Sequence, residues 1–220
     1  GLACCVAIGL YIDDELSYDR FHPNRNVYRV TEVQKQAGDF YPVAVMPGVL
    51  AKELKNDFSP IEQTCRIGRL WRSPVFESES ISIEPGNVLI VDNSLFKMFH
   101  FPFLYGDPET ALSGPNDVVL TEKIAKALFG VEWRSGNVLG KEITLNNDRV
   151  LTIAAIAQDP PANSHIQFDA LLSMKHEEAT SDNFGWNSNN YHTYISLSPR
   201  TDLTSLKASL FRYLDKFNKE

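Results

Sequence analysis

The sequence predicts an α+β fold in which one α/β unit is split by an inserted, mostly β subdomain. Two observations carry this prediction. The chain opens with a strand–helix–strand pattern and closes with a strand and an amphipathic helix, and the stretch between them has the texture of short strands and turns. Of the 220 residues, 43% are hydrophobic and 22% are charged, which is ordinary for a globular protein with one or two cores.

The opening unit is expected to hold two strands and one helix. Residues 27–33 and 61–70 are rich in β-branched and aromatic side chains, so each is expected to form a strand. Between them, residues 47–58 are expected to form a helix that Pro47 opens. Its apolar side chains are spaced four apart and lie on one face: Leu50, Leu54 and Phe58.

The middle of the chain is expected to be mostly β. Short strands are predicted over 80–84, 87–91 and 118–120, and a hairpin is predicted with strands over 141–145 and 149–157. The hairpin prediction depends on the turn chemistry of the three residues between these strands, Asn146, Asn147 and Asp148.

A short helix is expected after residue 120. Thr121 is placed to cap its first turn, and Gly130 is placed to end it. Its apolar face would carry Ile124, Ala125, Leu128 and Phe129.

Four phenylalanines crowd the turn-rich segment before this helix: Phe96, Phe99, Phe101 and Phe103. Core filling of the middle subdomain is the favoured interpretation. A hydrophobic contact surface for a partner is the alternative.

The end of the chain again has the pattern of a strand followed by a helix, as the opening unit does. Residues 185–190 form the expected connection back to the first unit, and residues 191–197 alternate as a strand does. An amphipathic helix is predicted to follow, with one apolar face. This face holds Leu203, Leu206, Leu210, Leu214 and Phe217.

The first twelve residues carry no charge and are followed by four acids, Asp13, Asp14, Glu15 and Asp19. We interpret this apolar run as part of a transmembrane helix. Twelve residues are too few to cross a bilayer alone, so the run would be the end of such a helix. The run lacks the basic start and the cleavage site of a signal peptide. A helix buried in the core is the alternative. Cytoplasmic flanks are enriched in Lys and Arg, and the first basic residue after the run is Arg20, so we expect residues 13–220 to lie outside the cytoplasm.

Charge and cysteine usage narrow the function classes. The formal net charge is −7, and the chain has no basic cluster of the size that nucleic-acid binding needs. Binding to anionic lipid headgroups is disfavoured for the same reason. Cys4 and Cys5 are adjacent within the apolar run, and Cys65 is expected to be a small buried hydrophobic residue, so no disulfide framework is expected.

No motif predicts catalytic, cofactor-binding or metal-binding residues, and we expect none of the three. Residues 136–141 (GNVLGK) resemble a phosphate loop, but they have three residues between the glycines and Glu142 where the motif needs a hydroxyl. The histidines lack a metal-ligand spacing, although His165, His176 and His192 could assemble in space. No G-x-S-x-G elbow is present.

Several strings together resemble the MacB/FtsX-like ABC transporter permeases, in their MacB-like periplasmic core domain. The most specific is DELSYDRFHPN over residues 14–24, directly behind the apolar run, followed by VYRV over 27–30. The remaining carriers follow in the expected order. They are DNSLF over 92–96, Phe99, Phe101, Pro102, GDP over 106–108, VLTE over 119–122, Ala125, LFG over 128–130, Gly140, Lys141, Pro161, NSH over 163–165, Phe168 and Trp186.

The resemblance implies a domain organisation and a mechanical function without catalysis. Residues 1–22 would end the first transmembrane helix, 23–70 and 185–220 would form a Porter-like subdomain, and 71–184 an inserted Sabre-like subdomain. The domain would relay ATP-driven transmembrane motion to a periplasmic substrate or partner, and the 203–217 helix would be the transmitting element. No cofactor is implied.

The resemblance also implies partners and a location. The partners would be a cytoplasmic ABC ATPase, a second permease copy and a periplasmic adaptor or substrate protein. The inner membrane would hold the flanking helices, with this domain in the periplasm. Two other functions stay open: a periplasmic binding module for a peptide, lipoprotein or adaptor, and an anchored hydrolase, which would need a deep cleft with convergent polar groups.

Overall fold

The structure is a computed structural model that describes residues 1–36, 38–70, 72–79, 81–135, 137–181, 184–186 and 188–213. The chain divides into two compact units, and each combines two separate stretches of sequence. Unit 1 comprises Gly1–Arg25 and Arg69–His176, and unit 2 comprises Asn26–Gly68 and Glu177–Glu220. Four residues that enter the sequence predictions, Ser80, Gly136, Asn187 and Leu214, lie outside the described residues, as does Phe217.

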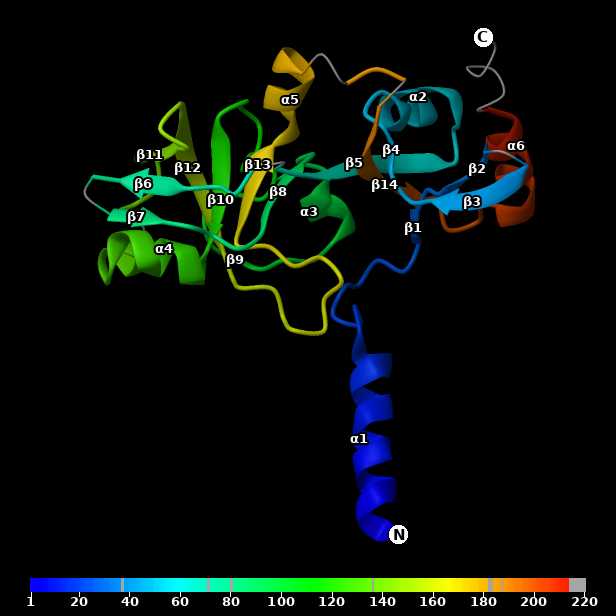
Figure 1. Cartoon of the computed structure of the whole chain (residues 1–220), viewed down its shortest axis with the longest axis horizontal. Helices are drawn as coiled ribbons and strands as arrows, with labels where there is room; N and C mark the ends of the chain where they lie inside the picture. Colours follow the sequence, from blue (N-terminus) through cyan, green and yellow to red (C-terminus); the bar gives the residue numbers. More distant parts are fainter. Residues whose placement is uncertain are drawn as a thin grey trace. The chain divides into compact units, whose positions relative to one another are not determined.

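Unit 1 is built on one mixed sheet with the strand order β8-β13-β10-β12-β11-β6-β7, and β9 pairs with β12 (Figure 1). Strands β8 and β13 are parallel, as are β10 and β12, whereas the other pairs are antiparallel. The strands are β6 Phe76–Ser78, β7 Ile81–Ile83, β8 Val88–Val91, β9 Phe103–Tyr105, β10 Asp117–Thr121, β11 Glu142–Leu145, β12 Arg149–Ala157 and β13 Ala170–Ser173. The helices are α1 Leu2–Ser17, α3 Leu95–Met98, α4 Glu122–Phe129 and the 3-10 helix Glu132–Ser135, and α5 Met174–Thr180 leads out of the unit.

The central strands of this sheet are buried along their length. Val118, Val119 and Leu120 of β10 are fully buried, and all residues of β8 and β13 are buried too. Strands covered on both faces consist of continuous apolar runs rather than alternating ones. This is why the short apolar runs at 87–91 and 118–120 predict strands correctly.

Helix α4 begins and ends where the sequence predicts, but its first turn is different. Gly130 ends the helix with a positive φ of 58°. Thr121, however, makes no capping bond with its side chain. Thr121 is the last residue of β10, and its hydroxyl is turned into the interior, where it has no hydrogen-bond partner among the described residues. The predicted cap is therefore wrong, because the strand holds the threonine in another orientation.

The hairpin and the phenylalanine segment follow the sequence closely. Strands β11 and β12 pair around Asn146 and Asn147, whose φ values of 54° and 59° are those that a tight hairpin turn requires. Phe99 and Phe101 are each 5% exposed, and the ring of Phe101 packs edge-on against Phe168 at 5.1 Å between centroids. Core filling is therefore the correct interpretation of these two phenylalanines.

Unit 2 is a smaller antiparallel sheet with the order β1-β14-β5, with β4 paired to β14. A separate two-stranded hairpin is formed by β2 and β3. The elements are β1 Val27–Arg29, β2 Glu32–Gln36, β3 Asp39–Val43, β4 Met46–Pro47, α2 Leu50–Asp57, β5 Ile61–Arg69, β14 Asn189–Leu197 and α6 Leu203–Tyr213. Its core cluster consists of Met46, Leu50, Leu54, Ile61, Ile195, Leu197, Leu206 and Tyr213.

Two boundaries in unit 2 differ from the sequence prediction. The strand expected over 27–33 is broken into β1 and β2. The helix expected from Pro47 begins at Leu50 instead, because Pro47 pairs with Asn189 in β4. Local proline chemistry favoured a helix start, and the pairing with a strand far along the chain overrides it.

Unit 2 also contains a buried arginine. Arg66 of β5 is 6% exposed, and its guanidinium donates to the carbonyl of Gly48 at 2.9 Å and to Glu178 Oε1 at 2.6 Å. The same group lies over the ring of Phe184, 4.9 Å from the centroid. Glu178 is therefore the partner of a buried cation.

Helix α1 stands out because none of its residues is buried. Leu2, Leu10 and Leu16 are 82%, 67% and 58% exposed. The alternative of a helix buried in the core is therefore wrong. Among the described residues, no helix combines the length and the apolar character needed to span a membrane. Cys4 and Cys5 are exposed on α1, whereas Cys65 is buried, as its sequence context predicts.

At Gly106 a left-handed backbone coincides with close steric contacts. Gly106 follows β9 with a φ of +92°, and a Cβ there would lie 2.6 Å from Ala155 Cβ and 2.7 Å from the carbonyl of Ala154. Gly140 also has a positive φ, of 79°, but a Cβ there would meet nothing within 4 Å. A side chain at Gly140 would therefore meet backbone strain alone, whereas a side chain at Gly106 would meet backbone strain and steric overlap.

We expect Gly106→Ala to lower the free energy of unfolding by about 3 kcal/mol, because it adds overlap with β12 to the cost of a left-handed backbone. Gly140→Ala is the matched control and should cost about 1 kcal/mol, from the backbone alone. Urea unfolding of both variants checks this. Equal losses in the two variants would contradict the close approach of Gly106 to β12.

Candidate functional site

The end of α1 and the turn that follows it form the candidate functional site, which we call the α1 root (residues 17–25). Helix α1 ends at Ser17, and the chain reverses through Asp19, whose φ of 56° is in the left-handed region. His22 N–H donates to the carbonyl of Asp19 at 3.2 Å, and Arg20 N–H donates to that of Ser17 at 3.1 Å. Asp is one of the few residue types that tolerate such a backbone, so the residue type fits the turn.

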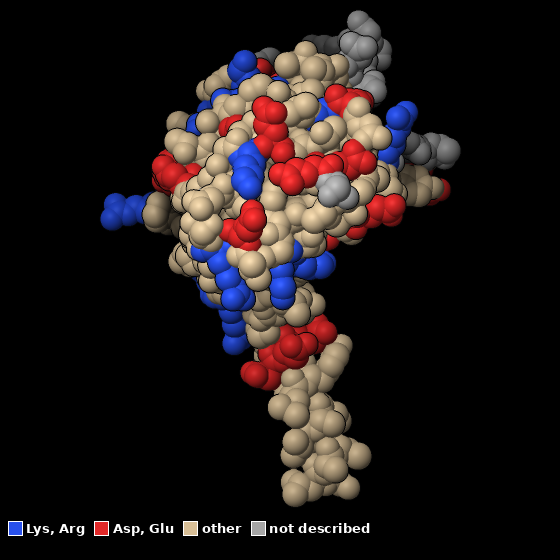
Figure 2. Space-filling view, turned by 90° about the vertical axis from the view of Figure 1, so that its left-hand side faces the viewer, with Lys and Arg blue, Asp and Glu red and all other residues tan. Residues whose placement is uncertain are grey.

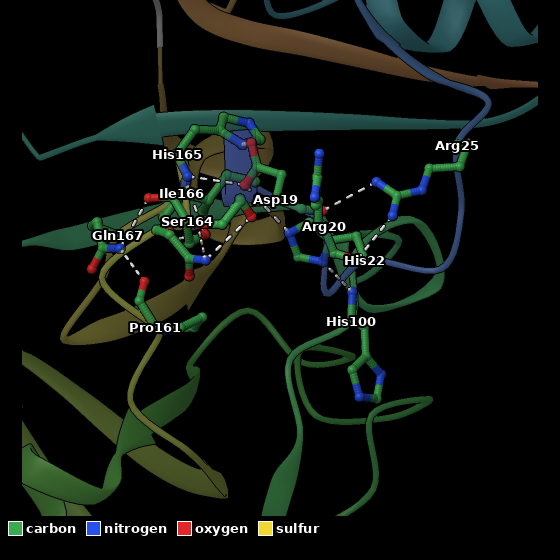
Figure 3. Close-up of polar contacts among 12 residues, drawn as sticks. Asp19, Arg20, His22, Arg25, His100, Pro161, Ser164, His165, Ile166 and Gln167 are labelled. Carbon is green, nitrogen blue, oxygen red and sulfur yellow. Dashed lines mark hydrogen bonds and ion pairs between the residues drawn. The ribbon is translucent and has the colours of Figure 1, made fainter. Parts of the chain in front are cut away.

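The α1 root is bound to the loop that follows the Pro160-Pro161 pair, 146 residues further along the chain (Figure 3). Asp19 N–H donates to the carbonyl of Asn163 at 2.9 Å, and the side-chain amide of Asn163 donates to Ser17 Oγ at 2.9 Å. The loop donates a further bond to the root, because His165 N–H donates to Asp19 Oδ1 at 3.0 Å, and His165 Nδ1 lies 2.7 Å from Asp19 Oδ2. Backbone and side chains of both segments therefore take part.

The 161–167 loop, which binds the α1 root, also has hydrogen bonds of its own. Ser164 is buried, and its hydroxyl bonds the carbonyl of Ile166 at 2.9 Å. The side-chain amide of Gln167 donates to the carbonyls of Pro161 at 2.7 Å and Ser164 at 2.9 Å. These bonds lie within the loop, so the loop that binds the α1 root is also stabilised by contacts of its own.

The contact between Asp19 and His165 fixes one tautomer of the imidazole. A carboxylate only accepts hydrogen bonds, so Nδ1 of His165 must carry the proton that it shares with Asp19 Oδ2. The Asp19 carboxylate thus accepts one backbone and one side-chain bond from the same residue, which is a two-point contact like that of a carboxylate with an arginine fork.

His22 anchors the root from the inside. Its ring is 4% exposed and makes edge-on contacts with Phe99 and Phe101, with centroids 5.2 and 5.3 Å away. Its Nδ1 accepts a hydrogen bond of 2.9 Å from the backbone N–H of His100. Its Nε2 lies 3.8 Å from Asp19 Oδ1, beyond hydrogen-bond distance, and has no hydrogen-bond partner among the described residues.

Burial is the main cause that lowers the pKa of His22 to about 4, Asp19 opposes this shift, and the neighbouring His165, His100 and Arg25 add to the lowering. The ring is therefore neutral at pH 7. The acceptor role of Nδ1 requires the same neutral form, with the proton on Nε2.

Arg25 stabilises the turn through hydrogen bonds to two of its backbone carbonyls. Its guanidinium donates to the carbonyl of Arg20 at 2.9 Å and to that of Asp19 at 3.5 Å. The α1 root is thus held by bonds within itself, by the 161–167 loop and by the phenylalanines of the unit 1 core. A displacement of α1 cannot leave this part of unit 1 in place without breaking several of them.

At the α1 root, hydrogen bonds join the end of α1 to a distant loop of the same unit. Among the described residues, no group of three or more His, Cys, Asp or Glu side chains is arranged to hold a metal ion. Of the three histidines considered together from the sequence, His165 lies at the α1 root, His176 lies on α5, and His192 in β14 of unit 2 bonds the carbonyl of Ala44.

A cavity of about 410 Å³ lies elsewhere in unit 1. Its described lining includes two arginines and one glutamate, Arg69, Arg72 and Glu84. Ser73 also lines it, but the described lining has no histidine or cysteine, so it contains no pair of a nucleophile and an imidazole base.

Comparisons with known proteins fit this architecture. A family described as the MacB-like periplasmic core domain matches residues 1–212. The chain belongs to this family. It is a periplasmic core domain of the MacB/FtsX-like ABC transporter permeases, and membership implies a membrane-associated transporter that works with an ATPase. The α+β fold class that the sequence predicts and the resemblance it shows are both confirmed.

Solved structures show the same MacB-like fold. A domain of a Porphyromonas gingivalis protein assigned as a permease aligns with a TM-score of 0.73 at 23% identity, covering 90% of this chain and 84% of that one. The periplasmic region of MacB from Actinobacillus actinomycetemcomitans aligns at 0.62 and 16% identity, covering 88% and 85%. The extracellular domain of the noncanonic ABC-type transporter YknZ from Gram-positive bacteria aligns at 0.57 and 11%, covering 84% and 88%. No curated protein matches the sequence significantly.

Sequence reasoning found the residues of the α1 root only through the resemblance to the MacB-like family. Asp19, His22, Asn163 and His165 all lie in the strings that carry it. Nothing in the residue types alone indicated that two segments 146 residues apart would bond each other. The one local signal was a short polar turn directly behind an apolar helix.

We expect Asp19→Ala to lower the free energy of unfolding of unit 1 by about 2–3 kcal/mol, since it removes two acceptors and leaves alanine in a left-handed turn. Asp19→Asn should cost about 1 kcal/mol, because asparagine tolerates this backbone and retains one acceptor. Asp13→Ala, on the exposed surface of α1, is the control and should change stability by less than about 0.5 kcal/mol. Chemical denaturation measures all three, and similar losses for Ala and Asn would rule out the backbone contribution.

Proposed function

We propose that this MacB-like domain relays ATP-driven motion of transmembrane helices to a substrate or partner in the periplasm, and that the α1 root is where the motion enters unit 1. The observation that carries the proposal is the contrast along α1. The helix makes no buried contact along its length, whereas the residues directly after it are bonded to unit 1 from three sides.

The exposed surface of α1 supports a place in the bilayer. Figure 2 shows the first part of the helix as a surface without charged side chains, next to a band of acidic residues. Leu2, Ile8 and Leu10 are 82%, 58% and 67% exposed, which is costly in water. We propose that residues 1–12 end a transmembrane helix and that residues 13–220 lie in the periplasm.

The two units support a division of labour. We propose that unit 2 is the Porter-like subdomain expected over 23–70 and 185–220, and that the sheet of unit 1 is the Sabre-like subdomain expected over 71–184. A body can relay displacement only if it does not deform. The buried strands β8, β10 and β13 supply this stiffness in unit 1, because closely packed interiors have low compressibility.

The proposal includes no chemistry within this domain and no cofactor. ATP hydrolysis would take place in a cytoplasmic ABC ATPase, and a second permease copy would supply the opposing domain. A periplasmic adaptor or substrate protein would receive the motion. The sequence suggests the 203–217 helix as the transmitting element. Its described part, which ends at Tyr213, contacts the core of unit 2 and so supports a second connection. There Leu206 is buried in the unit 2 core, and Tyr213 donates to Asp57 at 2.7 Å.

One observation favours the alternative of a periplasmic binding module. The β2–β3 hairpin forms its own two-stranded sheet, and Val33 and Phe40 on it are 61% and 68% exposed. Their register places both on the same face, since Val33 lies opposite Pro42 and Phe40 lies two residues before Pro42. An apolar face of this kind could hold a peptide, a lipoprotein or an adaptor.

The native cysteines test the position of α1. In spheroplasts that contain the full-length permease, a membrane-impermeant maleimide should leave Cys4 and Cys5 unlabelled, because lipid covers them. A variant with Val131→Cys, 82% exposed in unit 1, should be labelled from outside. Detergent should expose Cys4 and Cys5, while buried Cys65 should react only after denaturation. Labelling of Cys4 and Cys5 in intact spheroplasts would contradict the membrane assignment.

A flexible insertion tests the relay. In the full-length permease with its ATPase in lipid nanodiscs, Gly-Gly-Ser inserted after Ser17 should leave ATP hydrolysis intact and abolish ATP-dependent movement of the domain. Spin labels at Val131 in unit 1 and Ser209 in unit 2, in a Cys4→Ser, Cys5→Ser background, report the movement as a shift in their distance distribution.

The matched control places the same insertion between Asn147 and Asp148, at the tip of the β11–β12 hairpin, where a surface turn tolerates added residues. This control should retain the ATP-dependent shift. A shift of wild-type size after insertion at the α1 root would refute the relay, and loss of the shift in both variants would show that the effect is not specific to the root.

A further inference from the structure

We propose that His22 makes the α1 root a pH-sensitive joint: protonation of its ring breaks the bond from His100 and releases the root from the core of unit 1. This inference rests on the proposed function, because it names a regulation of the same joint. Falling pH on the periplasmic side would weaken the relay. The inference stands on the geometry around both nitrogens of one buried ring.

The Nδ1 side of the ring accommodates only the neutral form. His22 Nδ1 accepts the backbone N–H of His100 at 2.9 Å. A protonated imidazole carries a hydrogen on both nitrogens and has no acceptor left. Two N–H groups would then point at each other at 2.9 Å, so either the ring or the segment around His100 has to move. That segment lies between Phe99 and Phe101, the two phenylalanines that pack on the ring.

The Nε2 side offers the cation too little in return. Nε2 lies 3.8 Å from Asp19 Oδ1, beyond hydrogen-bond distance, and this oxygen already accepts the backbone N–H of His165. The other charged or titratable groups that face the ring are His165 from the 161–167 loop, His100 from the segment after α3, and Arg25 from the end of the root. Burial of the ring is the largest cause that disfavours its protonated form, and these three groups add to it, whereas Asp19 opposes it.

The strength of the switch follows from the change in protonation. A released His22 titrates near its ordinary pKa of 6.5, whereas burial lowers the pKa in the closed root to about 4. The closed root therefore binds fewer protons than the released one between these values, so acid favours release as pH falls through this range. The ratio of released to closed root should rise about 20-fold from pH 7 to pH 5.

Hydrogen exchange at His100 measures this release directly. In the full-length permease in nanodiscs, mass spectrometry of the peptide that holds Phe99–Phe101 should show protection of the His100 amide falling about 20-fold from pH 7 to pH 5, after correction for intrinsic exchange. The amides of β10, in the core of the same unit, should keep their protection over this range.

Two variants separate His22 from its neighbours. His22→Asn places an amide oxygen where Nδ1 accepts the His100 N–H, and it cannot titrate, so the pH dependence should disappear even if the root is looser throughout. His100→Gln retains the backbone N–H and removes a neighbouring titratable ring, so the pH dependence should remain.

The outcome is decided by the pH dependence and not by the level of protection. Protection of His100 that stays constant from pH 7 to pH 5 would overturn the inference, as would an equal change in His22→Asn. A pH-dependent release that His22→Asn abolishes supports it. If the ATP-dependent shift between spin labels is absent at every pH while release at His100 still depends on His22, the proposed relay fails and the pH-sensitive joint stands.

Discussion

The turn at Asp19 is the constraint that ties α1 to the rest of unit 1. It reverses the chain in a left-handed conformation, and its backbone and both carboxylate oxygens are bonded to Asn163 and His165. These bonds are made to a loop with its own internal hydrogen bonds, so the joint needs little ordering when it forms. The direction in which α1 leaves the unit is therefore set by this turn, because the helix has no buried contacts of its own.

The relay that we propose requires stiff elements on both sides of the α1 root. On the unit 1 side, the receiving loop runs directly into β13, which is buried between β8 and β10. On the other side, α1 is a continuous helix up to Ser17. Stiff elements that meet at a bonded turn transmit displacement, while a flexible linker would absorb it. Membership of the MacB-like periplasmic core domain family gives such a joint a context, since the family's domains belong to membrane transporters.

The joint also contains a structural compromise. His22 fills the space between Phe99 and Phe101 and satisfies the His100 N–H, but it leaves its own Nε2 unpartnered among the described residues. A buried polar atom without a bond lowers stability, and such atoms in native structures often mark functional positions. Arg66 in unit 2 is the opposite case, because its buried charge is matched by Glu178 and by the carbonyl of Gly48.

The sequence by itself determined the α+β class, the strands with continuous apolar runs, the Asn146–Asn147 hairpin and the end of α4 at Gly130, because each depends on neighbouring residues. Only the tertiary structure decided the rest. Pro47 joined a strand instead of opening a helix, and Thr121 turned inward instead of capping, because distant strands fixed their backbones. The bonds between Asp19 and His165 were also out of reach, since local periodicity carries no information about which segments meet after folding.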